Sequence, residues 1–198
     1  MKLARAALAT LIFLAVLCTF YYVHMRFFPV NVVFYAALMD VVLAAVVSAV
    51  ALSLLGLLSP LGAFERTQLF AIWLLAGYAL AISGPTVIDR SLSFYILEKL
   101  QQRGGAIKQS AFEDVFKQEY MVEHRLVDVR LTEQLQSGTI TIEDGCVKLT
   151  GKGQRLAAFS RYFRANWLPK HRLLMGEYSA DLTDPFRKDT AHAPYGCQ

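Results

Sequence analysis

Three long apolar runs occupy the first 88 residues of the chain, and almost all charged side chains come after them. The runs cover about residues 6–26, 30–58 and 68–88. A helix needs about 20 apolar residues to cross the hydrocarbon core of a bilayer, and each run is long enough. The pattern predicts a membrane α-helical region over residues 1–88, with three transmembrane helices joined by short loops.

The first run resembles a signal peptide at its start, because Lys2 and Arg5 precede it. No small-residue cleavage site follows, however, and the run continues into Tyr21 and Tyr22. Tyrosines of this kind are typical of the interface between membrane and water. We therefore expect an uncleaved helix.

Asp40 is the one acidic residue of the second run. One interpretation places it at the water interface, with residues 30–39 as an interfacial lead-in to the helix. The other starts the helix near Asn31 and places Asp40 at depth, where a carboxylate is a functional candidate. The free energy needed to bury a charge favours the first interpretation. Asp40 stays a possible intramembrane polar site.

Small side chains recur every four residues along the second run, and a glycine follows one turn on. This spacing lets another helix approach closely. That helix belongs either to this chain or to a partner subunit. The positions predicted for helix packing are Ala45, Ala49, Ser53 and Gly56.

Beyond the third run, the pattern changes to short amphipathic elements. Asp89 or Ser91 can cap a helix that ends at a pair of glycines. Ser110, with Glu113 three residues on, forms a capping box for a second helix. A third helix is predicted over about residues 123–136, where Leu126, Val129 and Leu135 give a partial core stripe.

A β-hairpin is the clearest local signal in this part of the chain. Residues 139–142 alternate polar and apolar side chains, and Asp144-Gly145 suits a tight type I′ turn. Residues 146–149 then form the return strand. A final helix is predicted over about residues 153–167.

The order of these elements, with a short extended piece at 106–108, resembles the winged-helix fold. The stretch VKLTGKGQRLA, residues 147–157, is similar to the end of the wing in MarR- and PadR-type regulators, where Leu-Thr ends a strand and Lys-Gly starts a helix. The resemblance covers about residues 91–167. It implies a small α+β winged-helix-like domain over 89–170, which leaves 171–198 as an extended or disordered tail. Winged helices bind DNA or proteins, so the fold selects no activity.

Charge argues against DNA binding. From Asp89 onward the chain has sixteen basic and fourteen acidic residues, a net charge of only +2. The predicted wing tip, Glu143-Asp144, would put two carboxylates against phosphate, where a DNA reader needs cations. The residues to suspect if nucleic acid did bind are Arg125, Arg130 and Lys148.

A basic aromatic segment without any acidic residue extends over residues 145–176. On a helix, Leu156, Phe159, Phe163 and Trp167 share one face. That face either closes the domain core, or lies on anionic headgroups, or contacts an anionic lipid-linked substrate held by another protein. Each basic residue near an anionic surface contributes about 1 kcal/mol to binding. The residues predicted to contact the membrane surface or anionic lipid are Lys152, Arg155, Arg161, Arg164, Trp167, Lys170 and Arg172.

Motifs for catalysis, metals and cofactors are missing from the sequence. There is no Gly-rich phosphate loop, no GxSxG elbow and no HExxH. The three cysteines have no CxxC or Cys/His spacing, so neither a zinc site nor a disulfide framework is expected. Asp89-Arg90 could be an active-site pair at the membrane surface, but a helix cap and interface anchor is the simpler interpretation.

We expect a non-enzymatic accessory or scaffold subunit of a bacterial-type inner membrane. Its helices would pack with a larger integral membrane protein, and its winged-helix domain would bind a protein or the anionic phospholipid surface. One alternative is a membrane-tethered winged-helix transcription regulator. Another is a small enzyme or cofactor subunit that acts on a lipid-linked substrate, with Asp40 or Asp89 facing a shared cavity.

The side of the membrane follows from the basic residues that flank the three spans. Lys2, Arg5 and Arg66 lie on one side, and the basic N-terminus argues for that side as the cytoplasmic one. The other side has one more basic residue, and the count therefore favours a cytoplasmic C-terminal domain. The residues counted on that side are Arg26, Arg90, Lys99 and Arg103.

Overall fold

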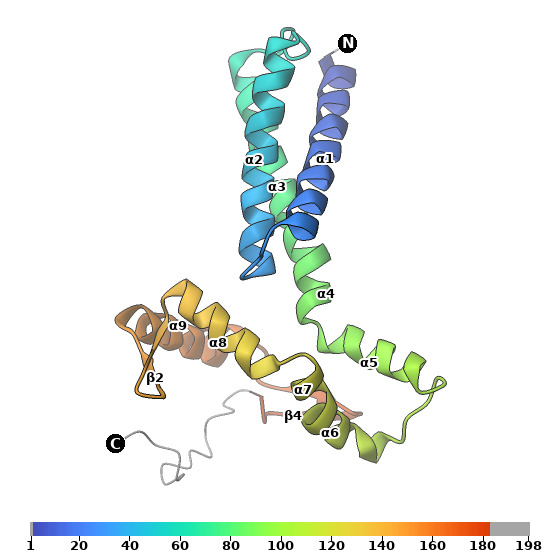
Figure 1. Cartoon of the computed structure of the whole chain (residues 1–198), viewed down its shortest axis with the longest axis vertical. Coiled ribbons are helices and arrows are strands. Elements are labelled where there is room, and N and C mark those ends of the chain that lie inside the picture. The colour runs from blue at the N-terminus through green and yellow to red at the C-terminus, as the bar shows by residue number, and fades with distance from the viewer. Residues whose placement is uncertain (1, 183–198) are drawn as a thin grey trace. The chain divides into compact units, whose positions relative to one another are not determined.

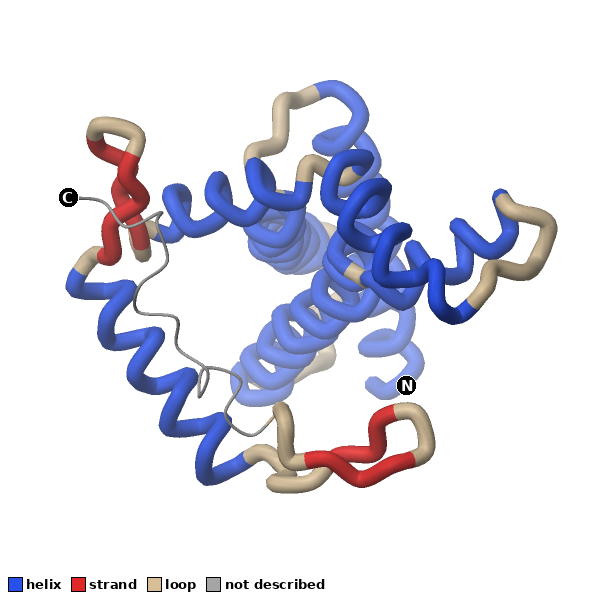
Figure 2. The backbone as a smooth tube through the Cα atoms, turned by 90° about the horizontal axis from the view of Figure 1, so that it is seen from below, coloured by secondary structure: helices blue, strands red, loops and turns tan. Residues whose placement is uncertain are grey.

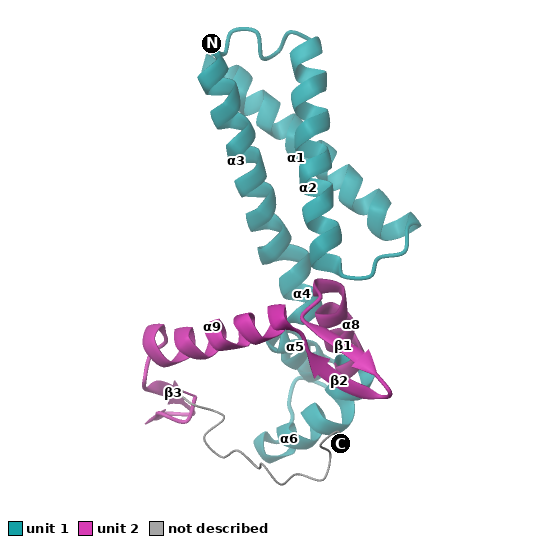
Figure 3. Cartoon of the chain, turned by 90° about the vertical axis from the view of Figure 1, so that its left-hand side faces the viewer, with its two compact units in different colours: residues 1–126 teal, residues 127–198 magenta. Residues whose placement is uncertain are grey.

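The computed structural model describes residues 2–182; Met1 and residues 183–198 are outside the described part. The chain divides into two compact units, Met1–Leu126 and Val127–Gln198 (Figure 3). Helices dominate, and the strands form two separate two-stranded antiparallel hairpins (Figure 2). The fold is therefore mostly helical, with a small α+β part, as the sequence predicts at this coarse level.

Three long apolar helices lie side by side in the first unit (Figure 1). They are α1 (Lys2–Phe27), α2 (Val33–Leu54) and a third helix that begins as α3 (Ala63–Ala81). All three are long and apolar enough to cross a membrane. The three predicted apolar helices are thus present, with ends that differ by a few residues from the predicted ones.

The third helix passes through Ser83-Gly84-Pro85 without ending there. It continues through a π-helical turn (η1, Ile82–Thr86) into α4 (Val87–Arg90). A proline in a regular helix removes one hydrogen bond and clashes with the preceding turn. The wider π-helical turn accommodates Pro85, so the helix persists.

Aromatic packing and one glycine hold the three apolar helices together. The rings of Phe13 and Trp73 stack at 5.2 Å, and Trp73 Nε1 donates a hydrogen bond of 3.0 Å to Thr10 Oγ1. A Cβ atom on Gly77 would lie 2.4 Å from Val41 Cγ1. Glycine at this position therefore permits the close approach of α2 and α3.

The small residues of α2 lie on more than one face. Ala45 is fully buried and Ala49 packs against the core, but Ser53 is exposed. Gly56 lies beyond the end of α2, in a turn where its φ is +71°. A strict four-residue spacing rotates about 40° per step around a helix, so it drifts off the buried stripe. The buried small residues of α2 are Ala37, Ala44, Ala45 and Ser48.

The first unit continues with α5 (Leu92–Gln102), and Ser91 caps it. The Ser91 hydroxyl accepts a hydrogen bond of 3.3 Å from the Phe94 amide. Of the two predicted caps, the structure therefore uses Ser91 and not Asp89.

Residues 109–123 form one irregular helical stretch. It consists of η2 (Gln109–Ala111), α6 (Phe112–Asp114), η3 (Val115–Tyr120) and α7 (Met121–Glu123). The predicted capping box at its start is wrong, because the stretch begins one residue before Ser110. No side chain caps it there, and Glu113 pairs with Lys117 instead. The buried hydrophobic residues of this region are Tyr95, Val115 and Tyr120, with Phe116 and Leu126 packed against them.

The next helix, α8 (Leu126–Ser137), begins after Arg125, whose φ of 44° is incompatible with a continuous helix. The predicted start at residue 123 is therefore three residues too early. Of the predicted core stripe, Leu126 is partly buried, but Val129 and Leu135 are exposed. No residue of α8 is buried.

The predicted hairpin is confirmed as β1 (Ile140–Glu143) and β2 (Cys146–Leu149). Asp144 and Gly145 have φ of 52° and 77°, the positive values that a type I′ turn requires. The last helix, α9 (Gly151–Trp167), follows directly, and the Thr150 hydroxyl accepts a 3.1 Å hydrogen bond from the Gly153 amide.

A second hairpin lies at the start of the segment predicted to be an extended or disordered tail. Its strands are β3 (Arg172–Leu174) and β4 (Glu177–Ser179). Met175 and Gly176, with φ of 51° and 97°, form its turn. The expected tail is therefore partly wrong, and the rest of it, residues 183–198, lies outside the described residues.

Candidate functional site

The aromatic face of α9, defined as Leu156, Phe159, Phe163 and Trp167, is uncovered in the described part of the second unit. The exposed fractions are 54% for Leu156, 60% for Phe159 and 68% for Trp167. Neighbouring rings on this face contact each other at centroid distances of 6.0 and 6.3 Å. Gly153 is the one buried residue of α9. The interpretation in which this face closes the domain core is therefore not what the structure shows.

Most of the basic residues predicted to contact lipid lie on or next to this helix. Arg155 and Arg161 are exposed, and Arg164 is half-buried. Lys152 donates a 2.5 Å hydrogen bond to the Ser137 carbonyl. No described carboxylate pairs with a cation of α9, so the helix combines uncompensated positive charge with exposed aromatic rings. The remaining predicted residues follow α9: Lys170 lies before β3 and Arg172 begins β3.

The three residues suspected of binding nucleic acid do not form a free cationic surface. Arg130 pairs with Glu133 at 2.9 Å, and Lys148 pairs with Glu143 across the hairpin at 2.8 Å. Arg125 lies at the break between α7 and α8. Acidic neighbours thus compensate two of the three charges that DNA binding would use.

Lys99 is the centre of an ion-pair network that joins α5 to the irregular helix. It is 5% exposed, and its Nζ lies 2.8 Å from Glu123 and 2.9 Å from Glu119. Tyr95 donates a 2.9 Å hydrogen bond to Glu123 from the same side. The partners are 20 and 24 residues from Lys99 along the chain, so no sequence pattern could have found them.

The network shifts the pKa of each of its members. Hydrogen bonds with Glu123 and then Glu119 raise the pKa of Lys99, and the same contacts lower the pKa of both carboxyls. Burial, and then the hydrogen bond to Glu123, raises the pKa of Tyr95. Every cation here has an acidic partner, and this favours a structural role over a catalytic one.

Asp40 lies inside the helical bundle, paired with His24. Its exposed fraction is 2%, and its Oδ1 is 2.8 Å from Nδ1 of His24. Its Oδ2 has no hydrogen-bond partner among the described residues. The helix α2 is continuous from Val33 through Asp40, so most of residues 30–39 belong to the same helix as Asp40.

A groove of about 370 Å³ runs between α1 and α2 beside this pair. We call it the His24 groove. The other side chains that line it are mostly apolar: Thr19, Phe20, Val23, Phe28, Met39 and Leu43. The groove therefore combines lipid-like walls with one buried carboxyl and one imidazole.

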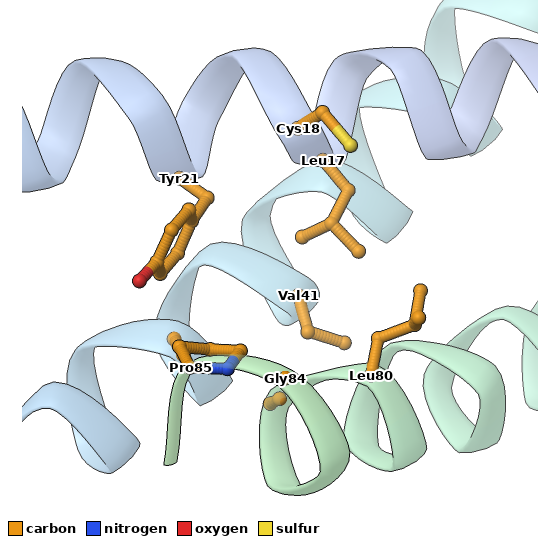
Figure 4. A pocket seen from close by; sticks show the side chains of 9 residues that line it. Leu17, Cys18, Tyr21, Val41, Leu80, Gly84 and Pro85 are labelled. Carbon is orange, nitrogen blue, oxygen red and sulfur yellow. The ribbon is translucent and has the colours of Figure 1, made fainter. Parts of the chain in front are cut away.

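A second, smaller cavity of about 210 Å³ lies next to the π-helical turn (Figure 4). Leu17, Cys18 and Tyr21 of α1 line one side of it, and Gly84 and Pro85 line the other. Its lining is almost wholly apolar, so it suits a hydrocarbon group and offers little to a polar ligand.

Asp89 and Arg90 lie in α4, the last turn of the third apolar helix. Asp89 is exposed, and the guanidinium of Arg90 lies 6.0 Å from the centre of the Phe34 ring. This contact resembles an interface anchor, in which a cation packs on an aromatic ring.

The described residues contain no group of three His, Cys, Asp or Glu side chains placed to hold a metal. Cys18 is a free, exposed thiol. Cys146 is disulfide-bonded, a single bond that the cysteine spacing did not predict.

No protein-family model, no curated protein and no solved structure matches the chain. Function therefore has to be argued from the sites themselves.

Proposed function

We propose that the protein is a non-enzymatic accessory subunit of a bacterial-type inner membrane. Its apolar helices pack with a larger integral membrane protein, and its C-terminal part, a winged-helix-like module, acts as a scaffold at the membrane surface. The observation that carries this proposal is the aromatic face of α9, which the described residues leave uncovered, together with cations that no described carboxylate pairs. Such a face, in a chain with three membrane-type helices, suits contact with a partner or with anionic headgroups.

The apolar helices support the same proposal. Large side chains on α2 remain exposed on the side away from its buried stripe, among them Val42, Val46 and Val50. Lipid covers such a surface, but so does a neighbouring transmembrane helix. Three helices alone leave much of this surface available for a partner.

The basic residues that flank the spans favour a cytoplasmic C-terminal part, by a margin of one residue. The disulfide at Cys146 bears on the same question, because disulfides are rare in a reducing cytosol. The redox state of Cys146 in intact cells therefore tests the orientation. Persistence of the disulfide there would place this part on the oxidising side and overturn the cytoplasmic placement.

The accessory role predicts that the aromatic face of α9 contributes to partner binding. In Phe163→Glu, a carboxylate replaces a ring at the centre of this face. Ala165→Glu is the matched control, because it adds the same charge on the opposite side of the helix. Each tagged full-length chain is extracted in a mild detergent, and the proteins that co-purify are quantified by mass spectrometry.

We expect a membrane protein to co-purify stoichiometrically with the wild type and with Ala165→Glu. Phe163→Glu should recover at least about fivefold less of it, since one buried aromatic anchor commonly contributes 1 kcal/mol or more to an interface. Equal recovery of the partner with the wild type, Phe163→Glu and Ala165→Glu would show that the aromatic face of α9 is not part of the interface. A wild-type chain that is purified without any stoichiometric membrane protein would refute the accessory role.

A further inference from the structure

The orientation of His24 is the starting point for a second site, inside the membrane-type helices. Its Nδ1 makes the 2.8 Å bond to Asp40, so Nε2 faces away from that carboxyl. Nε2 has no partner among the described residues, and the side chain of His24 is 17% exposed where it lines the His24 groove. One nitrogen is thus fixed by Asp40, and the other is open to the groove.

His24 can offer a hydrogen-bond donor to the groove through Nε2. Two states of the pair present a hydrogen there: an imidazolium beside a carboxylate, and a neutral imidazole beside a carboxylic acid. In both, Nδ1 is engaged with Asp40 and Nε2 carries a hydrogen. The groove therefore presents a hydrogen-bond donor, and its ligand must supply an acceptor oxygen.

The position of His24 along α1 indicates at which level of the bilayer that acceptor lies. The 26 residues of α1 span about 39 Å, whereas the hydrocarbon core of a bilayer is about 30 Å thick. His24 comes three residues before the end of α1, which is about 5 Å along the helix axis. It lies at the level of lipid headgroups, with the apolar walls of the groove extending from there toward the hydrocarbon core.

We propose that the His24 groove binds a glycerophospholipid. One acyl chain lies along the apolar walls, and His24 Nε2–H donates a hydrogen bond to a phosphate oxygen of the headgroup. Asp40 is a positioning residue, because it holds the imidazole with Nε2 toward the groove. The volume of about 370 Å³ is within the range of ligand pockets. This site does not depend on a protein partner, so it can be tested independently of the proposed function.

The test is native mass spectrometry of the full-length chain in a mild detergent, titrated with palmitoyl-oleoyl phosphatidylglycerol. Diacylglycerol with the same chains is the ligand control, because it lacks the phosphate. In Leu43→Trp, an exposed wall residue becomes large enough to fill the groove. The matched control, Leu75→Trp, makes the same change at an exposed position of α3 that does not line the groove. In His24→Phe, the ring is kept and the donor is lost.

We expect the wild type and Leu75→Trp to retain one phosphatidylglycerol with equal affinity. Leu43→Trp should bind it about tenfold more weakly, because the groove is filled. His24→Phe should also bind it about tenfold more weakly, and diacylglycerol should bind the wild type about tenfold more weakly. In both of these cases one charge-assisted hydrogen bond is lost. Equal affinity of the wild type and Leu43→Trp would overturn the site, whether or not His24→Phe folds. If a photo-crosslinker at position 43 captured a protein and no lipid in cells, the groove would bind a protein, and the proposal of a glycerophospholipid would be contradicted.

Discussion

At the scale of single residues, two glycines set how closely neighbouring elements approach. Gly77 lets α2 and α3 pack, and Gly153 does the same between α9 and the first hairpin. A Cβ atom on Gly153 would lie 2.1 Å from the Thr139 carbonyl oxygen, which is a backbone atom and has little freedom to move. The same Thr139 oxygen accepts a 3.0 Å hydrogen bond from the Thr150 hydroxyl, so it is held in place.

We therefore predict that Gly153→Ala separates α9 from the hairpin. Overpacking against a fixed backbone atom costs about 2 kcal/mol or more. Gly151→Ala is the control, since no atom lies within 4 Å of the added methyl group in the same helix. Hydrogen exchange of residues 140–149, followed by mass spectrometry, should accelerate in Gly153→Ala alone. Equal protection of the hairpin in both variants would show that the contact is unimportant.

The His24–Asp40 pair shows, at the same scale, what the sequence could not reveal. The sequence identified Asp40 as a possible polar site but not its partner, because His24 lies sixteen residues away on another helix. A paired carboxyl can be buried where a lone one cannot.

At the scale of elements, the Lys99 network joins α5 to the irregular helix of residues 109–123. The lowered pKa of Glu119 and Glu123 stabilises the folded state at pH values above their ordinary value of 4.5. This contribution disappears as the pH falls through the lower pKa of the folded state. The raised pKa of Lys99 stabilises the folded state at lower pH. This contribution is complete at pH values below 10.5, the ordinary pKa of lysine, and is lost as the pH rises through the higher pKa of the folded state.

Replacing Lys99 with methionine should therefore lower the melting temperature of this region by several degrees, about 5 °C at pH 7. The loss should shrink as the pH falls below 4.5, where the carboxyls become neutral in both chains. Near-ultraviolet circular dichroism of Tyr95 and Tyr120, recorded on the full chain in detergent, reports the transition. Lys117→Met is the control, because Lys117 makes only an exposed pair within its own helix. A similar fall in both variants would refute a special role for Lys99.

The elements differ in how far the sequence could predict them. Length and apolarity predict the three apolar helices, and Asp144-Gly145 predicts the first hairpin, because both signals are local. The second hairpin turns at Met175-Gly176, where a non-glycine residue has positive φ, so no turn signal is visible. The exposed face of α9 could not be predicted either, since its aromatic spacing is the same for a core helix and a surface helix.

For the exposed face of α9, we predict contact with anionic lipid. The chain has two tryptophans, and Trp73→Phe leaves Trp167 as the single fluorescent reporter. In vesicles with phosphatidylglycerol, acrylamide should quench Trp167 about twofold less than in pure phosphatidylcholine, because basic residues draw α9 to the charged surface. About 0.5 M salt, or Arg155→Glu with Arg164→Glu, should remove the difference. Identical quenching in both vesicles would exclude docking through this face.

At the scale of the whole molecule, the chain combines three membrane-type helices with a C-terminal part whose aromatic and basic surface lacks a partner within the described residues. The buried charged residues of the described part, Lys99 and Asp40, are engaged in pairs that connect helices. These features together favour a protein that binds and positions other molecules.

The mass of the native assembly tests this account most directly. The tagged chain would be extracted with its surrounding lipid by a membrane-solubilising polymer, and the intact particle weighed by native mass spectrometry. The account predicts a particle heavier than the 22.1 kDa chain by the mass of a larger membrane protein in fixed stoichiometry. A particle that contains this chain and lipid alone would contradict it.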